Sequence, residues 1–333
     1  MTRAASTPAK RRRILLENLE AWLFVLPALV ILSVFHFLPA IAAFGMSFMR
    51  WGVLPERFTG LDNYLAILDP TGSRFEEFAN SVGVTLWYVV LTVPVEMALA
   101  LTVAYVLFQK VFARGAYRTA YFLPYVTSTV AAAAVFAWIF NPQYGFLNYL
   151  LNAIGIGNQS WTQEPRGLFE LAASSFGLTL SGLVAGPSLA LVSVAIMTVW
   201  HFVGFQTVIF MAGLGNISKE YYEAARIDGA NERQLFRHIT LPLLSPTTFF
   251  VLIIATIGAM RAFNQIYVLT SPQIGGPLGT TTTLSMEIYK TFFQRTASNG
   301  IGLGAAMAFI LVLLILALTF VQFRVVGRRV HYQ

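Results

Sequence analysis

The chain consists of long apolar blocks separated by short polar segments. One stretch, from Ala21 to Met49, carries no Asp, Glu, Lys or Arg, and it exceeds the ~20 apolar residues that a helix needs to cross a bilayer core of about 30 Å. Backbone groups in lipid must be paired within their own segment, so each block is predicted to be a helix. The pattern predicts an all-α fold, a polytopic transmembrane helical bundle with six core spans, at Trp22–Ser47, Val82–Phe108, Tyr117–Phe140, Leu189–Leu214, Thr247–Thr270 and Gly302–Phe323.

Composition supports a membrane protein and removes several other classes. Of 333 residues, 56% are hydrophobic and 11% are charged, whereas an ordinary soluble domain has about 25% charged residues. The chain has no cysteine, which excludes disulfides and thiolate metal sites. The net charge of +7 would be compatible with nucleic-acid binding, but its distribution indicates membrane orientation. We therefore expect contact with membrane lipid and none with nucleic acid.

The basic residues predict the orientation of the spans. Six spans place both termini on one side of the membrane, together with the 215–246 loop; that side holds 15 Lys and Arg residues and the other side holds 6. By the positive-inside rule, the richer side is cytoplasmic. This divides the chain into a cytoplasmic N-terminal segment (1–21), a transmembrane domain (22–325) and a cytoplasmic tail (326–333).

Two segments admit a second interpretation. The first block follows a basic stretch, as in a signal peptide, but its apolar region is longer than the ~7–15 residues of a signal core, so we predict a retained signal-anchor helix. The stretch from Leu168 to Leu214 is almost uncharged and could hold two spans, but an odd total would place the C-terminal arginines outside. We predict one span from about Leu189, preceded by an interfacial or re-entrant helix within an outer loop (141–187).

The polar loop 215–246 has clear signals for two short helices. Ser218 is a good N-cap residue, and Gly229 can adopt the left-handed conformation that ends a helix. Asn231 followed by Gln234 is typical of a capping box at the start of a second helix, which Leu241–Pro242 is expected to end because proline disfavours helical geometry in the residue before it. These signals predict a helix–turn–helix beneath the membrane. On physical grounds alone, it could be a connector packed on the protein's own helix ends.

The same loop carries a sequence pattern with fixed spacing. Glu223-Ala224-Ala225, Gly229, and then Ile239, Leu241 and Pro242 resemble the EAA loop of binding-protein-dependent ABC permeases, which implies a type I ABC importer permease fold. In that family, the loop is the coupling helix that docks on a cytoplasmic ATPase. The resemblance assigns ATPase coupling to Glu223, Ala224, Ala225, Asp228, Gly229, Ile239, Leu241 and Pro242.

Further segments resemble the carbohydrate-uptake branch of that family, of the maltose and glycerol-phosphate type. They are Leu123-Pro124-Tyr125, Asn141-Pro142 with Gly145, Trp161, Ile266–Thr270, Gly275-Gly276-Pro277 and Thr280–Thr282. The resemblance implies alternating-access import of a sugar or sugar-like solute across the cytoplasmic (inner) membrane of a prokaryote. It also implies three partners: a second permease subunit in a heterodimer, a cytoplasmic ABC ATPase dimer and an extracytoplasmic solute-binding protein. Residues 167–186 depart from the pattern as an apparent insertion.

The resemblance also indicates where the solute passes. Positions that contact sugar in the family fall on Tyr125, Thr129, Thr198 and His201, and in the fifth span on Ala255, Ala259 and Ala262, which cannot hydrogen-bond a hydroxyl. Arg261, Asn264 and Gln265 could compensate for those alanines. Each polar residue has a structural alternative, since Tyr125 could anchor the interface and the Thr and His side chains could bond neighbouring helices.

Two ionisable residues lie inside predicted spans. A charge at bilayer depth costs at least ~2.5–3.5 kcal/mol, so Arg261 is expected to face a cavity or a partner. Glu96 in the second span follows the same logic, which gives the hypothesis that the two residues form an ion pair.

Motifs for catalysis are missing from the sequence. It contains no G-x-x-x-x-G-K-[ST] loop and no H-E-x-x-H motif, and its four histidines are scattered. We therefore expect no enzyme activity, no metal site and no cofactor, with ATP bound and hydrolysed by partner ATPase subunits. The main alternative is an ion-coupled secondary transporter of a small polar solute, which would explain Glu96 and Arg261 but predicts inverted internal repeats that the sequence does not show. It also leaves the loop unexplained. A membrane-embedded enzyme would need clustered carboxylates or histidines at the membrane surface, which the sequence does not show. A structural scaffold is the remaining alternative, and its mark would be intact uptake after the chain is deleted.

Overall fold

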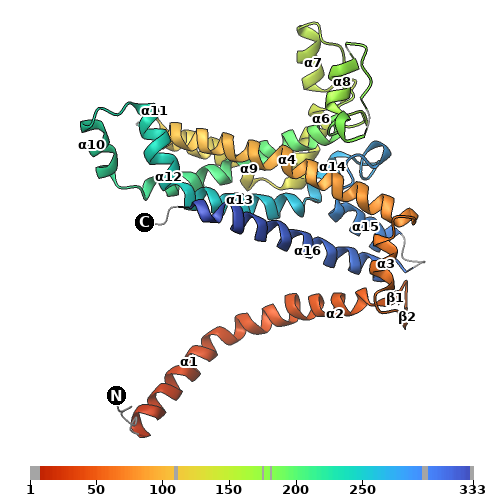
Figure 1. Ribbon diagram of the computed structural model, residues 1–333, viewed down its shortest axis with the longest axis horizontal. Helices are drawn as coiled ribbons and strands as arrows, with labels where there is room; N and C mark the ends of the chain where they lie inside the picture. The colour runs from red at the N-terminus through yellow and green to blue at the C-terminus, as the bar shows by residue number, and fades with distance from the viewer. Residues whose placement is uncertain (1–7, 109–111, 175, 181, 295–298, 331–333) are drawn as a thin grey trace.

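The protein is a bundle of long helices with polar helices at both ends. The computed structural model describes residues 8–108, 112–174, 176–180, 182–294 and 299–330. Four helices lie alongside one another in Figure 1: α4 (Ser73–Phe108), α9 (Leu189–Gly215), α13 (Ser245–Met260) and α16 (Gly300–Val325). Parts of the predicted basic segments, residues 1–7 and 109–111, lie outside the described residues.

The two ends of the bundle carry different elements. At one end, the short helices α10 (Lys219–Ile227) and α11 (Glu232–Leu235) protrude. From the other end project α7 (Phe146–Ala153) and α8 (Leu168–Ser174) (Figure 1). The first helix, α1 (Pro8–Leu32), begins on the side of α10, and α16 ends on that side as well.

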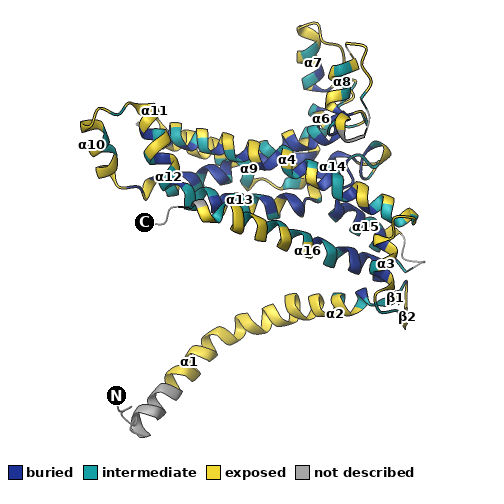
Figure 2. Cartoon of the chain, in the orientation of Figure 1, coloured by how far each residue is buried: buried dark blue, intermediate teal, exposed yellow. Residues whose placement is uncertain are grey.

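The N-terminal helix is largely separate from the bundle. It comprises α1, the π-helical turn η1 (Ser33–Phe37) and α2 (Leu38–Ser47) without interruption (Figure 1). The segment Leu16–Ser47, which contains the predicted span Trp22–Ser47, is long and apolar enough to cross a membrane, and its most apolar window has no buried residue. Figure 2 shows this exposure along most of the helix. Only its end packs on the bundle, where the rings of Phe44 and Phe309 lie 4.7 Å apart.

A small hairpin follows this helix and departs from the all-α prediction. Strands β1 (Met49–Trp51) and β2 (Pro55–Phe58) pair antiparallel, and α3 (Asp62–Leu68) comes next. The Asn63 amide donates to the carbonyl oxygens of Ser47 (2.8 Å) and Met49 (2.9 Å). Strands of three and four residues are too short to produce a recognisable period-2 pattern, so the sequence did not predict them.

The third predicted span is wrong as a single straight helix. The structure divides it into α5 (Arg114–Val126) and α6 (Thr129–Ile139), which are bent by 95°. Thr127 and Ser128 are extended, with ψ of 152° and 129°, and the Thr127 hydroxyl donates to the Pro124 carbonyl oxygen at 2.6 Å. Hydropathy did not reveal this bend because the two pieces together form one block long and apolar enough to cross a membrane.

The fifth predicted span is also interrupted. Helix α13 ends at Met260, Arg261 to Phe263 are not helical, and α14 (Asn264–Leu269) follows. The break turns the backbone around Arg261 and Asn264, so side chains of both segments can face one space.

The prediction that Leu241–Pro242 ends the second loop helix is wrong. The helix continues from α11 through the π turn η3 (Phe236–Thr240) and α12 (Leu241–Leu243), and the break falls at Leu244 with a bend of 64°. The Leu241 backbone N–H donates a hydrogen bond to the Phe236 carbonyl oxygen, five residues earlier in the chain. A wide π turn relieves the clash between a proline ring and the preceding turn.

By length and composition, four of the described helices can cross a membrane, or up to six segments if each bent pair is one span. Within the described part of 168–187, only the seven-residue α8 and the 3₁₀ turn η2 (Gly182–Ala185) are helical, so that region holds no second long helix. Helix α9 begins at Leu189, where the Ser188 hydroxyl accepts from the Leu191 amide at 3.0 Å. This agrees with a single span in that part of the chain.

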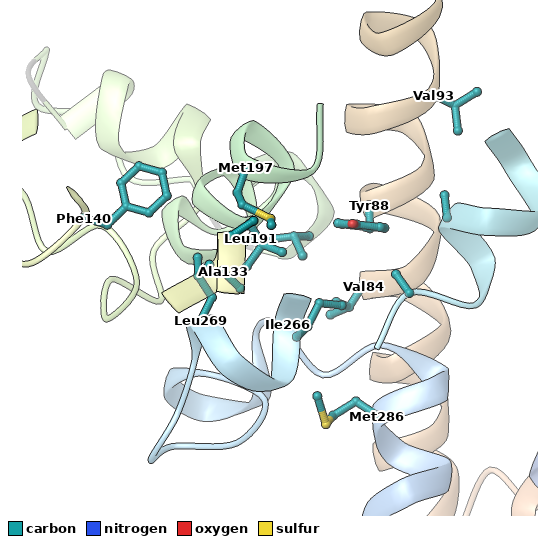
Figure 3. Close-up of a cluster of buried hydrophobic side chains, with 14 residues drawn as sticks. Val84, Tyr88, Val93, Ala133, Phe140, Leu191, Met197, Ile266, Leu269 and Met286 are labelled. Carbon is teal, nitrogen blue, oxygen red and sulfur yellow. The ribbon is translucent and has the colours of Figure 1, made fainter. Parts of the chain in front are cut away.

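The main apolar core lies where α4, α6, α9, α14 and α15 (Leu284–Gln294) meet. Figure 3 shows Val84 and Tyr88 from α4 facing Leu191 and Met197 from α9, with Ile266 below them. The Tyr88 side chain is 0% exposed although it carries a hydroxyl. A buried hydroxyl needs hydrogen-bond partners, and they lie at the site described below.

Close approach of α5 and α9 depends on one glycine. A Cβ atom at Gly204 would collide with the Tyr121 carbonyl oxygen, whereas a Cβ at Gly83 in α4 meets nothing within 4 Å.

We expect Gly204→Ala to destabilise the folded chain by about 1–3 kcal/mol, because overpacking forces the backbone of α5 away from α9. Gly83→Ala is the matched control and should be neutral or stabilising, because alanine favours a helix interior over glycine. The thermal unfolding midpoint of the purified protein measures both. Equal midpoints for the two variants would contradict the close-contact argument.

Candidate functional site

A cavity of about 400 Å³ lies among α4, α5, α6, α9, α13 and α14. It is within the ~300–1,000 Å³ typical of small-molecule sites. Six of the seven residues predicted for the solute path line it: Tyr125, Thr129, Thr198, Arg261, Asn264 and Gln265. The bends described above bring them together, because α5 and α6 supply the first two and the break after α13 supplies Arg261 and Asn264.

A directed chain of hydrogen bonds forms one wall of the cavity. The Gln265 amide donates to the Tyr88 hydroxyl at 2.9 Å, and the Tyr88 and Thr198 hydroxyls lie 2.7 Å apart. The Thr198 hydroxyl donates to the Val194 carbonyl oxygen at 2.9 Å, so Tyr88 donates to Thr198 in this arrangement. The chain fixes the orientation of three polar side chains that line the cavity.

The sequence analysis missed Tyr88, although a signal was present. Tyr88, Thr92 and Glu96 follow one another at i, i+4 and i+8 and therefore share a face of α4, and all three line the cavity. A polar stripe along an apolar helix indicates a face turned away from lipid.

We expect Tyr88→Phe to lower the stability of the folded chain by about 1–3 kcal/mol, because it leaves the buried Gln265 amide and Thr198 hydroxyl without their shared partner. Tyr149→Phe is the control, since Tyr149 on α7 is 71% exposed. Thermal unfolding of the two variants makes the comparison. If the Tyr88→Phe protein is as stable as the control, the hydrogen bonds that connect Gln265, Tyr88 and Thr198 do not stabilise the fold.

His201 is the one predicted solute-path residue that does not line the cavity. Its Nε2 lies 3.1 Å from the Thr129 hydroxyl oxygen, and its buried Nδ1 has no hydrogen-bond partner. The Tyr125 ring lies beside it with a centroid distance of 6.2 Å and stacks on Phe205 at 4.6 Å. His201 therefore contacts Thr129 and Tyr125 without lining the cavity itself.

Small residues on α13 and in the break after it form another part of the cavity wall. Ala255, Ala259 and Ala262, the positions where the resemblance expects contacts, all line the cavity together with Gly258. They offer no side-chain hydrogen bond. Their small size leaves the space open, and Arg261 and Asn264 supply polar groups at the end of this wall.

The hypothesis of an ion pair between Glu96 and Arg261 is wrong for this structure. Glu96 accepts a hydrogen bond from the Gln206 amide at 2.7 Å, and both residues line the cavity. Glu96 lies eight residues after Tyr88 on α4, a rise of about 12 Å. Arg261 lies four residues before Gln265, whose amide donates to the Tyr88 hydroxyl. The two charges therefore lie at different depths. Gln206 was missed because its partner on another helix cannot be read from either segment alone.

The loop that matches the family pattern forms a protruding helix at the opposite end from α7. Helix α10 has no buried residue, and Ile227 on it is 86% exposed. Its N-cap is Ser218, whose hydroxyl accepts from the Glu220 amide at 3.3 Å. The Tyr222 hydroxyl lies 3.1 Å from that of Thr240 and ties the helix to the bundle. A helix this exposed does not fit a connector packed on the protein's own helix ends.

The turn after α10 has the predicted local structure. Gly229 has φ of +83°, and a Cβ there would meet nothing within 4 Å. Asn231 and Gln234 form the predicted capping box, with bonds of 2.8 and 3.0 Å. Arg226 and Glu232 pair across the turn at 3.0 Å. The sequence pattern thus encodes an exposed helix and a rigid turn.

Among the described residues, no group of three or more His, Asp or Glu could hold a metal ion.

A polytopic bundle with an internal polar cavity and an exposed helix at one end defines a membrane transport subunit.

Comparison with known proteins specifies the family. Residues 96–332 match the family "Binding-protein-dependent transport system inner membrane component", and the chain belongs to this family. It is a multi-pass protein of the inner membrane and a permease subunit of an ABC importer. This agrees with the resemblance in the sequence and not with an ion-coupled secondary transporter.

Several characterised relatives match nearly the whole chain. The sn-glycerol-3-phosphate transport system permease protein UgpA of Agrobacterium fabrum is 35% identical and covers 93% of this chain and 96% of its own. The arabinooligosaccharides transport system permease protein AraP of Bacillus subtilis is 33% identical, covering 92% and 88%. The trehalose/maltose transport system permease protein MalF of Thermococcus litoralis is 32% identical, covering 91% and 92%.

The fold is also known from a solved structure. A chain of a bacterial ABC transporter involved in the import of the acidic polysaccharide alginate superposes with a TM-score of 0.73 and 21% sequence identity, covering 95% of this chain and 98% of that one. The chain therefore shares the overall fold of that transporter chain.

Proposed function

We propose that this permease subunit imports a sugar or sugar-like solute by alternating access, as one half of a heterodimer with a second permease subunit. The observation that carries the proposal is that one cavity is lined by six of the predicted solute-path residues: Tyr125, Thr129, Thr198, Arg261, Asn264 and Gln265. The names of relatives support the solute class, since they include permeases for arabinooligosaccharides, trehalose/maltose and lactose.

The chemistry of the cavity suits a polyhydroxylated solute. The Tyr88 hydroxyl, the Thr198 hydroxyl and the Gln265 amide can each donate and accept hydrogen bonds. Tyr125, which stacks on Phe205, offers an aromatic surface to the apolar face of a sugar ring. In the proposal, His201 positions Thr129. The small side chains of Ala255 and Ala259 on α13 leave the cavity wide enough for the solute.

Coupling to ATP is proposed to run through the exposed loop. Glu223, Ala224, Ala225, Asp228 and Gly229 would contact a cytoplasmic ABC ATPase dimer, which binds and hydrolyses ATP. Ile239, Leu241 and Pro242 would transmit the movement, because they continue helically toward α13.

The topology proposed for this function has six crossings and both termini in the cytoplasm. Residues 1–21, 215–246 and 326–333 are then cytoplasmic, 22–325 form the permease domain, and 141–187 form an outer loop with an insertion. An extracytoplasmic binding protein would deliver solute on that outer side, where α7 and α8 project.

Local polar contacts connect the outer loop, just before the apparent insertion, to the start of α9. Arg166 donates to both Glu164 carboxylate oxygens at 2.9 and 3.0 Å, which lowers the pKa of Glu164. The Leu189 amide donates to the Arg166 carbonyl oxygen at 3.2 Å. The loop thus has a fixed connection to the start of α9.

Uptake into liposomes that contain the complete assembly tests the proposal. Radiolabelled lactose, trehalose, an arabinooligosaccharide and sn-glycerol 3-phosphate serve as the panel, each with either ATP or an imposed ion gradient. We expect at least one member of the panel to accumulate with ATP and the binding protein, and none to accumulate with the gradient alone. Uptake that follows the ion gradient and ignores ATP would overturn the proposal.

A further inference from the structure

One polar pair in the cavity has no role in the function proposed above. Glu96 and Gln206 are each 4% exposed, although they lie in the middle of long apolar helices. The Gln206 amide nitrogen donates to a Glu96 carboxylate oxygen at 2.7 Å, and the Gln206 oxygen is buried without a partner. A buried acceptor left unpaired is destabilising, so this pair is incomplete as a purely structural contact.

The pair lies at the inner end of the cavity. Helix α4 runs toward the α10 side, and Glu96 is eight residues further along it than Tyr88, about 12 Å at 1.5 Å per residue. Val251 on α13 and Arg261, the residue after its end, both line the cavity and are ten residues apart, about 15 Å along the helix. The cavity therefore extends from a layer with Tyr88 and Arg261 to a layer with Glu96 and Gln206.

The two layers differ in hydrogen-bonding character. The outer layer contains strong donors, because the Arg261 guanidinium donates only and the Asn264 amide can donate. The inner layer contains acceptors: the Glu96 carboxyl and the unpaired Gln206 oxygen. The other lining residues near it, Ile209 and Val251, are apolar and satisfy neither acceptor. A ligand that completes the inner layer must bring hydrogen-bond donors.

We propose that Glu96 and Gln206 form an inner subsite that accepts hydrogen bonds from hydroxyl groups of the transported solute. This inference rests on the proposed function and extends the solute path along the second predicted span from Tyr88 to Glu96. Solute that leaves the outer layer exchanges its contacts with Tyr88 and Gln265 for contacts with Glu96 and Gln206. The subsite favours neutral polyhydroxylated solutes over solutes that bring an anionic group to the inner end.

A structural fastening between α4 and α9 is the competing explanation for the pair. A swap of the two residues, Glu96→Gln with Gln206→Glu, separates the two explanations. The swap keeps a carboxyl–amide contact between the helices but moves the carboxyl to α9. If the pair only holds α4 and α9 together, any carboxyl–amide contact between the two helices is sufficient. If the pair binds solute, the carboxyl must be on α4.

The reporter is a single cysteine at Ala255, which lines the cavity, in a chain that otherwise has none. A polar methanethiosulfonate reagent labels this cysteine, and the panel sugar with the highest uptake rate in the wild-type assembly protects it. The half-protecting concentration is measured in the Ala255→Cys background alone, with Glu96→Gln, and with the swap, in each case in the complete assembly. Thermal unfolding midpoints are recorded alongside.

We expect Glu96→Gln to raise the half-protecting concentration at least fivefold. The swap should likewise keep the unfolding midpoint at the wild-type value without restoring protection. If the swap does not fold, Glu96→Gln decides by itself, since a subsite predicts weaker protection at an unchanged midpoint. Equal protection in all backgrounds, restored protection in the swap, or a loss of protection that only parallels a lower midpoint overturns the subsite. If no panel sugar protects the Ala255→Cys assembly and none is taken up with ATP, the proposed function itself fails.

Discussion

Replacing Glu223 with alanine is expected to reduce ATP-driven solute uptake at least tenfold while the permease remains folded. Helix α10 has no buried residue, so the substitution removes no packing within the chain. The carboxylate lies on the exposed helix that we propose as the contact with the ATPase. Loss of this contact should leave ATP hydrolysis unresponsive to the solute-loaded binding protein.

Glu220→Ala is the matched control for this prediction. Glu220 is also an exposed glutamate of α10, one turn nearer to its N-terminus, so it controls for the loss of a negative charge from the helix. It should change uptake less than threefold. Equal loss in both variants would mean that charge alone matters and would count against a specific role of Glu223.

Filling the cavity is expected to stop transport without disturbing coupling. Gly258 lines the cavity, and a Cβ at this position meets nothing within 4 Å. Gly258→Leu therefore places a side chain in the open space and leaves the backbone of α13 unstrained. We expect uptake to fall at least tenfold, whereas Gly258→Ala should retain most of it.

Gly83→Leu provides the control, since Gly83 on α4 also has open space around an added Cβ but does not line the cavity. Uptake in liposomes and co-purification of the ATPase are both measured. Normal uptake by Gly258→Leu would show that the solute passes elsewhere. Loss of ATPase co-purification would show that the variant acts on assembly.

Local signals in the sequence predicted local structure well. The capping box at Asn231 and the positive φ at Gly229 depend on a few neighbouring atoms, and both are present in the structure. Apolar length also placed α4, α9 and α16, because lipid imposes a minimum length on a helix. Family membership followed from the same loop, which combines short-range geometry with a fixed spacing.

Features that depend on the backbone within an apolar block could not be predicted in the same way. The two sides of the bend at Thr127 and Ser128 together form one block apolar enough to cross a membrane, so the bend leaves no gap in that block. The π turn before Pro242 overrides the local preference of proline. The bend between α5 and α6 and the break after α13 bring the predicted polar residues together around one cavity. Partners between helices, such as Gln206 for Glu96, require the relative depth of two spans, which one sequence does not supply.

The most direct test of the central claim is the sidedness of the cavity during the ATP cycle. A cysteine at Ala255 in the complete assembly is labelled by a membrane-impermeant thiol reagent, added from either side of the liposome, with and without ATP bound to a hydrolysis-deficient ATPase. We predict labelling from the cytoplasmic side without ATP and from the outer side when ATP and the loaded binding protein are present. Labelling from the same side in both conditions, or equally from both sides, would contradict ATP-driven alternating access.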